Sequence, residues 1–252
     1  MKRPGPLPQD HGEQKPHLGV WDCKIMSKTP QKIDIVLVFH GIGTPPADCL
    51  EADLPYWVQE EKFLRTLDIA KERGDTLITF DDGLQSDVRI AMPALIERGL
   101  PGVFFPLTGM LGKPGYLTRE ELKSLADHGM VVGTHGHMHL DWAKVPRELR
   151  EKDIQDSLEI IEEILGTPCK EAAFPFGSFD RRVLASLKKF GIEKAYSCSR
   201  GKTNLANFLI HRTSIREVTD LDWMFQSLDK EKGIQKIKRG VKRFLRAHLP
   251  PF

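Results

Sequence analysis

The sequence predicts an α/β fold in which a parallel sheet is wrapped by helices. Along most of the chain, short apolar segments of strand length alternate with longer segments whose apolar residues repeat at helical spacing. The clearest short segment, Ile35–Phe39, is apolar at every position, as expected for a strand that is covered on both faces. A closed barrel and an open doubly wound sheet both fit this alternation.

The predicted elements follow one another in a regular order. Strands are expected at 35–39, 76–80, 103–105, 130–132, 171–174, 194–198 and 209–215. Helices are expected at 60–73, 87–98, 118–129, 146–165 and 181–190. Thr118 and Glu121 have the spacing of a capping box, and Gly99, Gly129 and Gly166 each follow the last turn of a predicted helix.

Length and composition place the chain among globular proteins. It has 252 residues, of which 40% are hydrophobic and 29% charged, which is enough for one large domain or two small ones. The polar, proline-rich residues 1–15 lack the apolar stretch of a secretory signal, and no apolar run reaches the roughly 18–20 residues that span a bilayer. The four cysteines have no paired spacing, which indicates reduced thiols. We therefore expect a cytoplasmic protein.

The near-neutral charge balance hides an uneven distribution. The formal net charge is +2, but residues 229–252 hold eight basic and two acidic side chains, so the rest of the chain is acidic. Apolar and basic residues alternate there at helical spacing, and a basic amphipathic helix is expected that either docks on the fold or contacts an anionic membrane through residues 230–246. Nucleic acid is not an expected partner, because neither an aromatic stacking platform nor a known binding motif accompanies the charge.

The first group of unusual polar residues follows a predicted buried strand. Thr79–Gly83 reads Thr-Phe-Asp-Asp-Gly. Holding Asp81 and Asp82 together after a buried strand is costly, because like charges repel and burial penalises both. The pair is either an ordinary Asp-Gly turn or part of a site with a cation.

The second group follows the strand at 130–132. His135, His137 and His139 stand within five residues of one another, in a chain that has nine histidines in all. Spacing of i, i+4 can bring His135 and His139 to one ion, and Asp82 could complete a three-ligand site for a divalent cation. The alternative is a histidine-rich surface loop. His137 is expected to be structural or to face substrate.

The third group, Ala172–Asp180, places aromatic residues around a Pro-Phe-Gly turn. These rings either close the core beneath a loop or form a wall against which a sugar ring can pack.

Together and in this order, the three groups resemble the motifs of the polysaccharide deacetylases with a NodB homology domain, carbohydrate esterase family 4. Thr79–Gly83 matches the family's TFDDG motif at every position, and His135–His139 matches its HxxxH metal motif apart from Gly136, where Ser or Thr is usual. Phe174–Gly177 resembles the third motif. The resemblance runs over roughly residues 33–215.

A narrower resemblance lies at the end of the first predicted strand. Phe39–Gly41 is similar to the corresponding motif of the poly-N-acetylglucosamine deacetylase branch, and it places His40 at the mouth of the site. Together with Leu54–Val58, this region looks like members encoded with O-antigen or exopolysaccharide genes.

The resemblance implies a distorted (β/α) barrel of seven strands and a metal-dependent enzyme that removes acetyl groups from N-acetylated sugars during surface-polysaccharide biosynthesis. It implies a divalent metal, zinc in the first instance, and it implies a role for each matched residue. The implied metal ligands are Asp82, His135 and His139. Asp81 becomes the general base and the backbone N–H of Phe176 an oxyanion donor, while His40 and His211 are the candidate proton donors.

Two departures from the family pattern fit either the poly-N-acetylglucosamine-like branch, with His40 as the relocated acid, or a loss of activity. The third motif usually begins with an arginine that orients the catalytic aspartate, and Ala173 occupies this position. The late Leu-x-Leu-His motif has only Leu209–His211 as its nearest approach. Two other functions stay open. Other C–N hydrolases resemble this fold, so the substrate could be a small amide, and Ala173 suggests a catalytically weak glycan-binding module.

These observations divide the chain into three parts. Residues 1–32 form an N-terminal arm, residues 33–228 form the deacetylase-like domain, and residues 229–252 form the basic helix.

Overall fold

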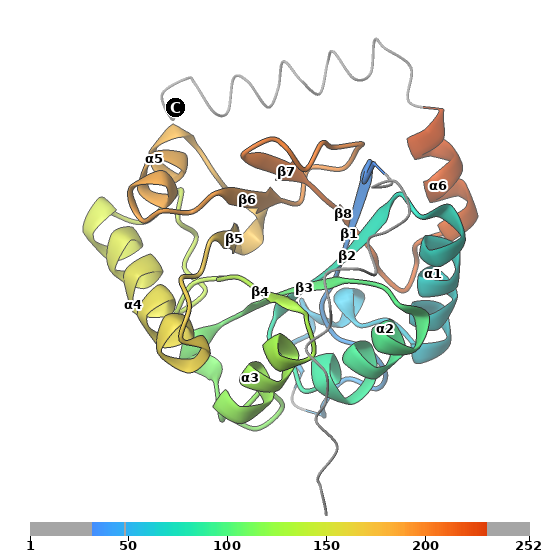
Figure 1. The fold of residues 1–252 in the computed structure, drawn as a ribbon, viewed down its shortest axis with the longest axis horizontal. Helices are drawn as coiled ribbons and strands as arrows, with labels where there is room; N and C mark the ends of the chain where they lie inside the picture. Colours follow the sequence, from blue (N-terminus) through green and yellow to red (C-terminus); the bar gives the residue numbers. More distant parts are fainter. Residues whose placement is uncertain (1–31, 48, 231–252) are drawn as a thin grey trace, which may run out of the picture. The chain divides into compact units, whose positions relative to one another are not determined.

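Eight parallel strands form the centre of the part of the chain that the computed structural model describes, residues 32–47 and 49–230 (Figure 1). One sheet has the order β4-β3-β2-β1-β8 and a second has the order β5-β6-β7. The strands are β1 (Ile35–Phe39), β2 (Thr76–Asp82), β3 (Gly102–Pro106), β4 (Val131–Val132), β5 (Glu171–Ala173), β6 (Lys194–Ser197), β7 (Leu209–His211) and β8 (Thr213–Ser214).

The two sheets are joined on both sides into a distorted barrel. On one side a single parallel bridge pairs Thr134 with Ala172. On the other side, β7 pairs with β6, and β8 pairs with β1. A single residue, Arg212, separates β7 from β8. The predicted strand 209–215 thus closes the ring, and counting it once gives the seven-stranded barrel that was predicted.

Helices surround the strands in chain order (Figure 1). They are α1 (Glu60–Arg73), α2 (Met92–Arg98), α3 (Arg119–Asp127), α4 (Arg147–Leu165), α5 (Arg181–Lys189) and α6 (Leu221–Asp229). Their apolar faces are buried against the sheet, while a smaller apolar cluster from β1, β2, β3, β5, β6 and β7 lies apart from this main core.

Aromatic rings fix the contact between the first helices and the sheet. Phe39, Phe80 and Phe104 are partners in adjacent strands, and their rings stack in sequence with centroids 6.0 and 4.5 Å apart. Phe63 of α1 meets the first of these rings edge-on at 5.1 Å. Such aromatic pairs contribute about 0.5–1.5 kcal/mol each beyond the area that they bury.

Most of the predicted helix ends agree with the structure. The capping box of α3 is complete, because Thr118 Oγ1 accepts from the Glu121 amide and the Thr118 amide donates to Glu121 Oε2. The predicted helix 87–98 is the exception, because a π-helical turn over Asp87–Ala91 precedes α2.

The arm up to residue 31 and the segment from residue 231 lie outside the described residues, so the predicted N-terminal arm and basic C-terminal helix stay predictions. Among the described residues, no helix combines the length and the apolar character needed to cross a bilayer.

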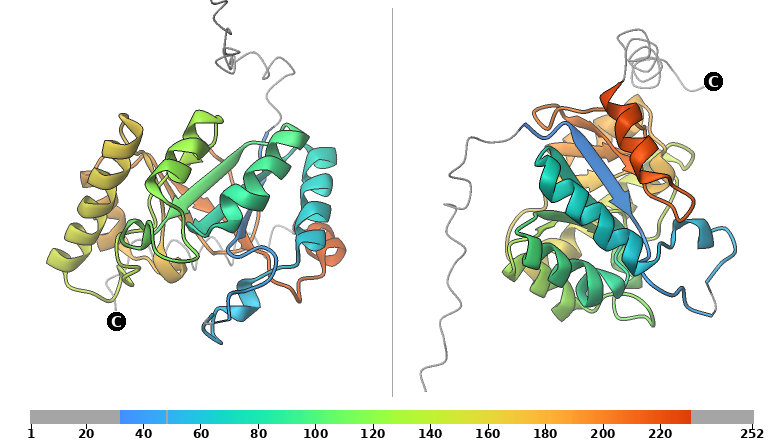
Figure 2. Two further views of the ribbon diagram at one scale, coloured as in Figure 1. Left: turned by 90° about the horizontal axis from the view of Figure 1, so that it is seen from below. Right: turned by 90° about the vertical axis from the view of Figure 1, so that its right-hand side faces the viewer.

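The loops that follow the strands position the site. All strand pairs are parallel, so the carboxyl ends of the strands open at one end of the barrel. Side views show the long loop between β1 and α1 and the loop between β8 and α6 at the same end (Figure 2). The polar residues singled out in the sequence lie at this end.

Candidate active site

A cleft of about 650 Å³ opens at the carboxyl ends of the strands. Its floor includes His40 after β1, Asp81 and Asp82 at the end of β2, and His135 and His139 after β4. The β1–α1 loop, the segment 114–116 and the turn around Phe176 form its walls. Residues from all three groups singled out in the sequence therefore meet in one place.

Backbone strain is concentrated in this cleft. Among the described residues, three that are not glycine have a positive φ: Asp82 (77°), His139 (54°) and Phe176 (58°). Left-handed backbone is unfavourable for residues with a side chain, and residues held in it cluster at functional sites. Strain in one residue from each of the three motifs indicates that the fold holds these side chains in defined directions.

Asp81 is held by an arginine that the motifs did not reveal. Arg212, between β7 and β8, donates from Nη1 to Asp81 Oδ1 at 2.7 Å and from Nη2 to Oδ2 at 2.8 Å. Both side chains are buried, and the guanidinium lies over the rings of Phe105 and Tyr196. Burial alone would raise the pKa of Asp81, but the charge and hydrogen bonds of Arg212 lower it to about 2. Asp81 is therefore a carboxylate throughout the neutral range.

Arg212 also changes how the absence of an arginine at position 173 is interpreted. The motif position of the orienting arginine is occupied by Ala173, but Arg212, from between β7 and β8, reaches the same carboxylate. Ala173 is fully buried in the cluster that contains Phe105 and Tyr196, the two rings beneath the guanidinium.

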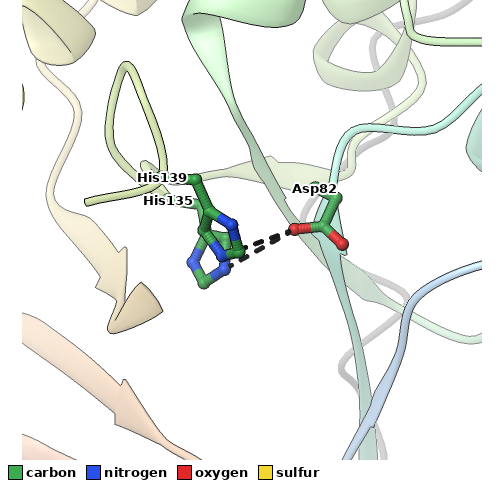
Figure 3. A group of neighbouring side chains, drawn as sticks. All are labelled: Asp82, His135 and His139. Atoms are coloured by element: carbon green, nitrogen blue, oxygen red, sulfur yellow. Dashed lines mark ion pairs between the residues drawn. The ribbon is translucent and has the colours of Figure 1, made fainter. Parts of the chain in front are cut away.

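Asp82, from the end of β2, converges with His135 and His139, from the loop after β4 (Figure 3). One ligand atom of each lies within 4.8 Å of the others. Asp82 Oδ1 is 3.7 Å from His135 Nε2 and 4.0 Å from His139 Nε2. His135 Nδ1 lies 3.1 Å from the Ala173 carbonyl, which can only accept, so the Nδ1 proton is donated there and the Nε2 lone pair faces Asp82.

These residues fit a divalent cation. Asp82 Oδ1 is buried and has no hydrogen-bond partner among the described residues. Burial first, and then the charge of Asp81, raise the pKa of Asp82 to about 7, while burial lowers the pKa of His135 to about 3 and also lowers that of His139. Without a cation, the facing lone pairs of two neutral imidazoles and a carboxylate repel one another, which destabilises the arrangement. With a metal ion, the same three groups form a normal donor set.

Asp153 on α4 braces the histidine loop, a role that the sequence did not suggest. It is buried and accepts from the Met138 amide at 2.7 Å and from Trp142 Nε1 at 2.8 Å. Gly136 has φ +88°, and a Cβ there would lie 2.4 Å from Asp153 Oδ2. This close approach explains why glycine replaces the usual Ser or Thr within the motif.

The structure separates the remaining histidines. His40 lines the cleft, its ring lies 4.9 Å from that of Tyr56, and burial lowers its pKa to about 4, so it is neutral at neutral pH. His211 does not line the cleft, and its Nδ1 lies 3.1 Å from Ser197 Oγ. His137 Nδ1 lies 3.0 Å from Thr108 Oγ1, which fits a structural role.

The β1–α1 loop supplies cleft residues that sequence reasoning did not assign. Trp57 lies against the backbone of Gly41, where a Cβ would come within 2.1 Å of the indole. Asp53 and Tyr56 line the cleft beside it. The only signal in the sequence was the similarity of Leu54–Val58 to related chains.

Comparison with known proteins identifies the family. A family model for polysaccharide deacetylases matches residues 68–195, just over half of the chain, including all three motifs. The chain belongs to the polysaccharide deacetylase family. Among curated proteins, the chain is similar to YxkH of Bacillus subtilis (strain 168), which is described as a polysaccharide deacetylase. The two are 23% identical over 208 residues, which cover 76% of this chain and 74% of YxkH.

Solved structures of other proteins share the fold of this chain. The deacetylase PplD of Streptococcus pyogenes, solved in complex with acetate, matches with a TM-score of 0.69 and 19% identity over 79% of this chain and 99% of that one. A de-N-acetylase from Aggregatibacter actinomycetemcomitans matches with a TM-score of 0.66 and 14% identity over 76% of this chain and 98% of that one. These similarities confirm the predicted NodB-like architecture.

Proposed function

We propose that the protein is a metal-dependent deacetylase that removes N-acetyl groups from an N-acetylated sugar or glycan. The observation that carries the proposal is the convergence of Asp82, His135 and His139 within 4.8 Å, beside an ionised Asp81, in a chain of the polysaccharide deacetylase family. Family membership supports a hydrolase that acts on carbohydrate amides.

Asp82, His135 and His139 would hold the cation, for which zinc is our first candidate because of the two imidazoles. When bound, such an ion polarises the acetamide carbonyl and lowers the pKa of the attacking water. The fixed tautomer of His135 keeps its Nε2 lone pair available for this purpose.

Asp81 is the proposed general base. Its Oδ2 lies 4.0 Å from His135 Nε2, so the carboxylate borders the three-ligand site without belonging to it. Arg212 occupies both carboxylate oxygens from one side and fixes the plane of the group. Asp81 accepts the proton of the attacking water, in a step that such positioned groups accelerate by about 10²–10⁴-fold.

The other two roles act on the products of this step. The backbone N–H of Phe176 donates to the oxygen of the former carbonyl as negative charge develops there. His40, in the cleft floor, is neutral at rest. It must therefore take up a proton, the one that the attacking water releases, before it gives one to the departing amine. His211 is left out of the mechanism, because it does not line the cleft.

The glycan-binding module loses its support, and no specific observation favours hydrolysis of a small amide. Ala173 was the reason for considering a catalytically weak glycan-binding module, and Arg212 removes that reason. We propose that the reaction belongs to surface-polysaccharide biosynthesis, because Phe39–Gly43 and Leu54–Val58 are similar to family members encoded with O-antigen or exopolysaccharide genes. We propose a cytoplasmic location from the composition of the chain.

Acetate release tests the proposal. The protein is treated with a chelator, reloaded with Zn²⁺ and incubated with UDP-N-acetyl sugars, N-acetylated oligosaccharides and small amides. The proposal predicts acetate and free amine from the sugars, loss of turnover after chelation, and recovery on reloading. Turnover of the small amides alone would show that the substrate class is wrong.

A further inference from the structure

A cation lies at the rim of the cleft with no carboxylate partner in the described part of the chain. Arg216, two residues after β8, is the one arginine or lysine among the described residues that line the cleft. It is exposed, and its guanidinium contacts Tyr56: the carbon Cζ lies 4.3 Å from the ring centroid and Nη2 donates to the hydroxyl.

The acids that follow Arg216 in the sequence have other partners. Glu217 accepts through Oε2 from the Gln59 amide at 2.9 Å. Asp220 caps α6 and accepts from the Trp223 amide, and Asp222 pairs with Arg65 at 2.8 Å. The local sequence therefore offers carboxylates to Arg216, but the fold directs them elsewhere.

The acids of the cleft floor do not neutralise Arg216 either. Asp81 is held by both nitrogens of Arg212, and Asp82 belongs to the three-ligand group. Asp53 lines the cleft without an ion pair to Arg216.

Tyr56 fixes the position of the guanidinium. Its ring lies 4.9 Å from that of His40, at an angle of 48°, so contacts through Tyr56 link His40 at the end of β1 to Arg216 at the rim. The tyrosine comes from the β1–α1 loop and the arginine from the β8–α6 loop. A guanidinium held in this way loses little side-chain freedom when it binds a ligand, and its remaining N–H groups suit a planar or tetrahedral oxyanion.

We propose that Arg216 is an anion-binding subsite that recognises a negatively charged oxyanion group, a phosphate or a carboxylate, next to the N-acetylated sugar. This inference rests on the proposed deacetylase function and adds the charge class of the substrate to it. Arg216 touches neither the metal ligands nor the base in this arrangement, so it sets substrate preference and leaves the chemistry unchanged.

Matched substrates test the proposal. N-acetylglucosamine 1-phosphate is compared with methyl N-acetylglucosaminide, and a disaccharide of N-acetylglucosamine and glucuronic acid with its glucose counterpart. Arg216→Gln is expected to raise KM for the charged substrate of a pair by about tenfold to a hundredfold. It should leave kcat for both substrates, and KM for the neutral substrate, unchanged. Tyr56→Phe keeps the ring and should give a smaller effect of the same kind.

The control is Arg65→Gln, which removes an exposed arginine outside the cleft. The Arg65 side chain is 61% exposed and pairs with Asp222. Arg65→Gln should therefore leave KM and kcat unchanged for both substrates of each pair. An effect in the phosphate pair identifies a phosphorylated substrate, and an effect in the uronate pair identifies an acidic glycan. Equal effects of Arg216→Gln on charged and neutral substrates, or no effect on either, would overturn the proposal.

Failure of the deacetylase function is distinguishable from failure of this subsite. If no substrate releases acetate, the deacetylase proposal fails, and binding of N-acetylglucosamine 1-phosphate is then measured by calorimetry. Binding that Arg216→Gln weakens, and Arg65→Gln does not, would support the subsite. Binding that neither variant changes would overturn it.

Discussion

Replacement of Arg212 by methionine tests whether the buried ion pair fixes Asp81. The two side chains are 0% and 1% exposed and share hydrogen bonds of 2.7 and 2.8 Å. Removing one partner of a buried pair costs about 3–5 kcal/mol, because the other charge is left without compensation. We expect a loss of this size in the free energy of unfolding of Arg212→Met at pH 8.

The pH dependence of this loss has a definite sign. In the wild type the pKa of Asp81 is lowered to about 2, so its contribution to stability is present above its ordinary pKa and disappears as the pH falls toward 2. In the variant, burial without Arg212 raises the pKa of Asp81 above the ordinary value, so Asp81 destabilises the fold increasingly as the pH rises toward that raised pKa. The gap between the two proteins therefore widens from pH 4 to pH 8.

Urea denaturation at pH 4, 6 and 8, with a chelator present, measures this gap. Arg65→Met is the matched control, because Arg65 and Asp222 are 61% and 66% exposed, and an exposed pair contributes only about 0.2–1 kcal/mol. In the metal-loaded enzyme, Arg212→Met should also lower kcat by about 10²-fold through loss of orientation. A loss below about 1 kcal/mol at pH 8, or a gap that does not widen with pH, would refute the ion-pair reasoning.

Three further predictions concern the metal site and the membrane. Asp153→Ala should weaken metal binding by about 10–100-fold, because it releases the histidine loop, whereas Asp156→Ala on the same helix should not; a chelator competition assay measures both. Because the pKa of Asp82 is raised to about 7, protons compete with the metal below that pH, and affinity measured by calorimetry should fall by about tenfold per pH unit; constant affinity from pH 8 to 5.5 would contradict this. Flotation with anionic liposomes should carry the full chain at low salt and release it at high salt if residues 230–246 bind membranes, and absence of binding at low salt would exclude that contact.

Local patterns in the sequence were enough to predict most of the barrel. The helix at 146–165 and its glycine stop agree with α4, because a long apolar stripe leaves little freedom in assigning the element. The turn at Asp87–Ala91 is π-helical, and five residues are too few to separate that period from an α-helix. Residues 209–215 read as one strand, and only the pairing with two different sheets shows why it divides at Arg212.

The site was predictable where its residues are adjacent in sequence. Asp81 and Asp82, and His135 with His139, stand within short motifs that carry their own chemistry. Arg212 and the bracing carboxylate Asp153 act from other strands and helices, so no local pattern contains them. A buried arginine requires a buried anion, but which anion it meets depends on how the barrel closes.

The most direct test of the central claim compares metal content and acetate release in the same preparations of wild-type protein, Asp81→Asn and Asp82→Ala. If Asp82 holds the metal and Asp81 is the base, Asp82→Ala loses both metal and turnover, whereas Asp81→Asn keeps about one metal per chain and loses acetate release by at least about 10²-fold. Full acetate release by metal-loaded Asp81→Asn, or undiminished metal in Asp82→Ala, would contradict the account.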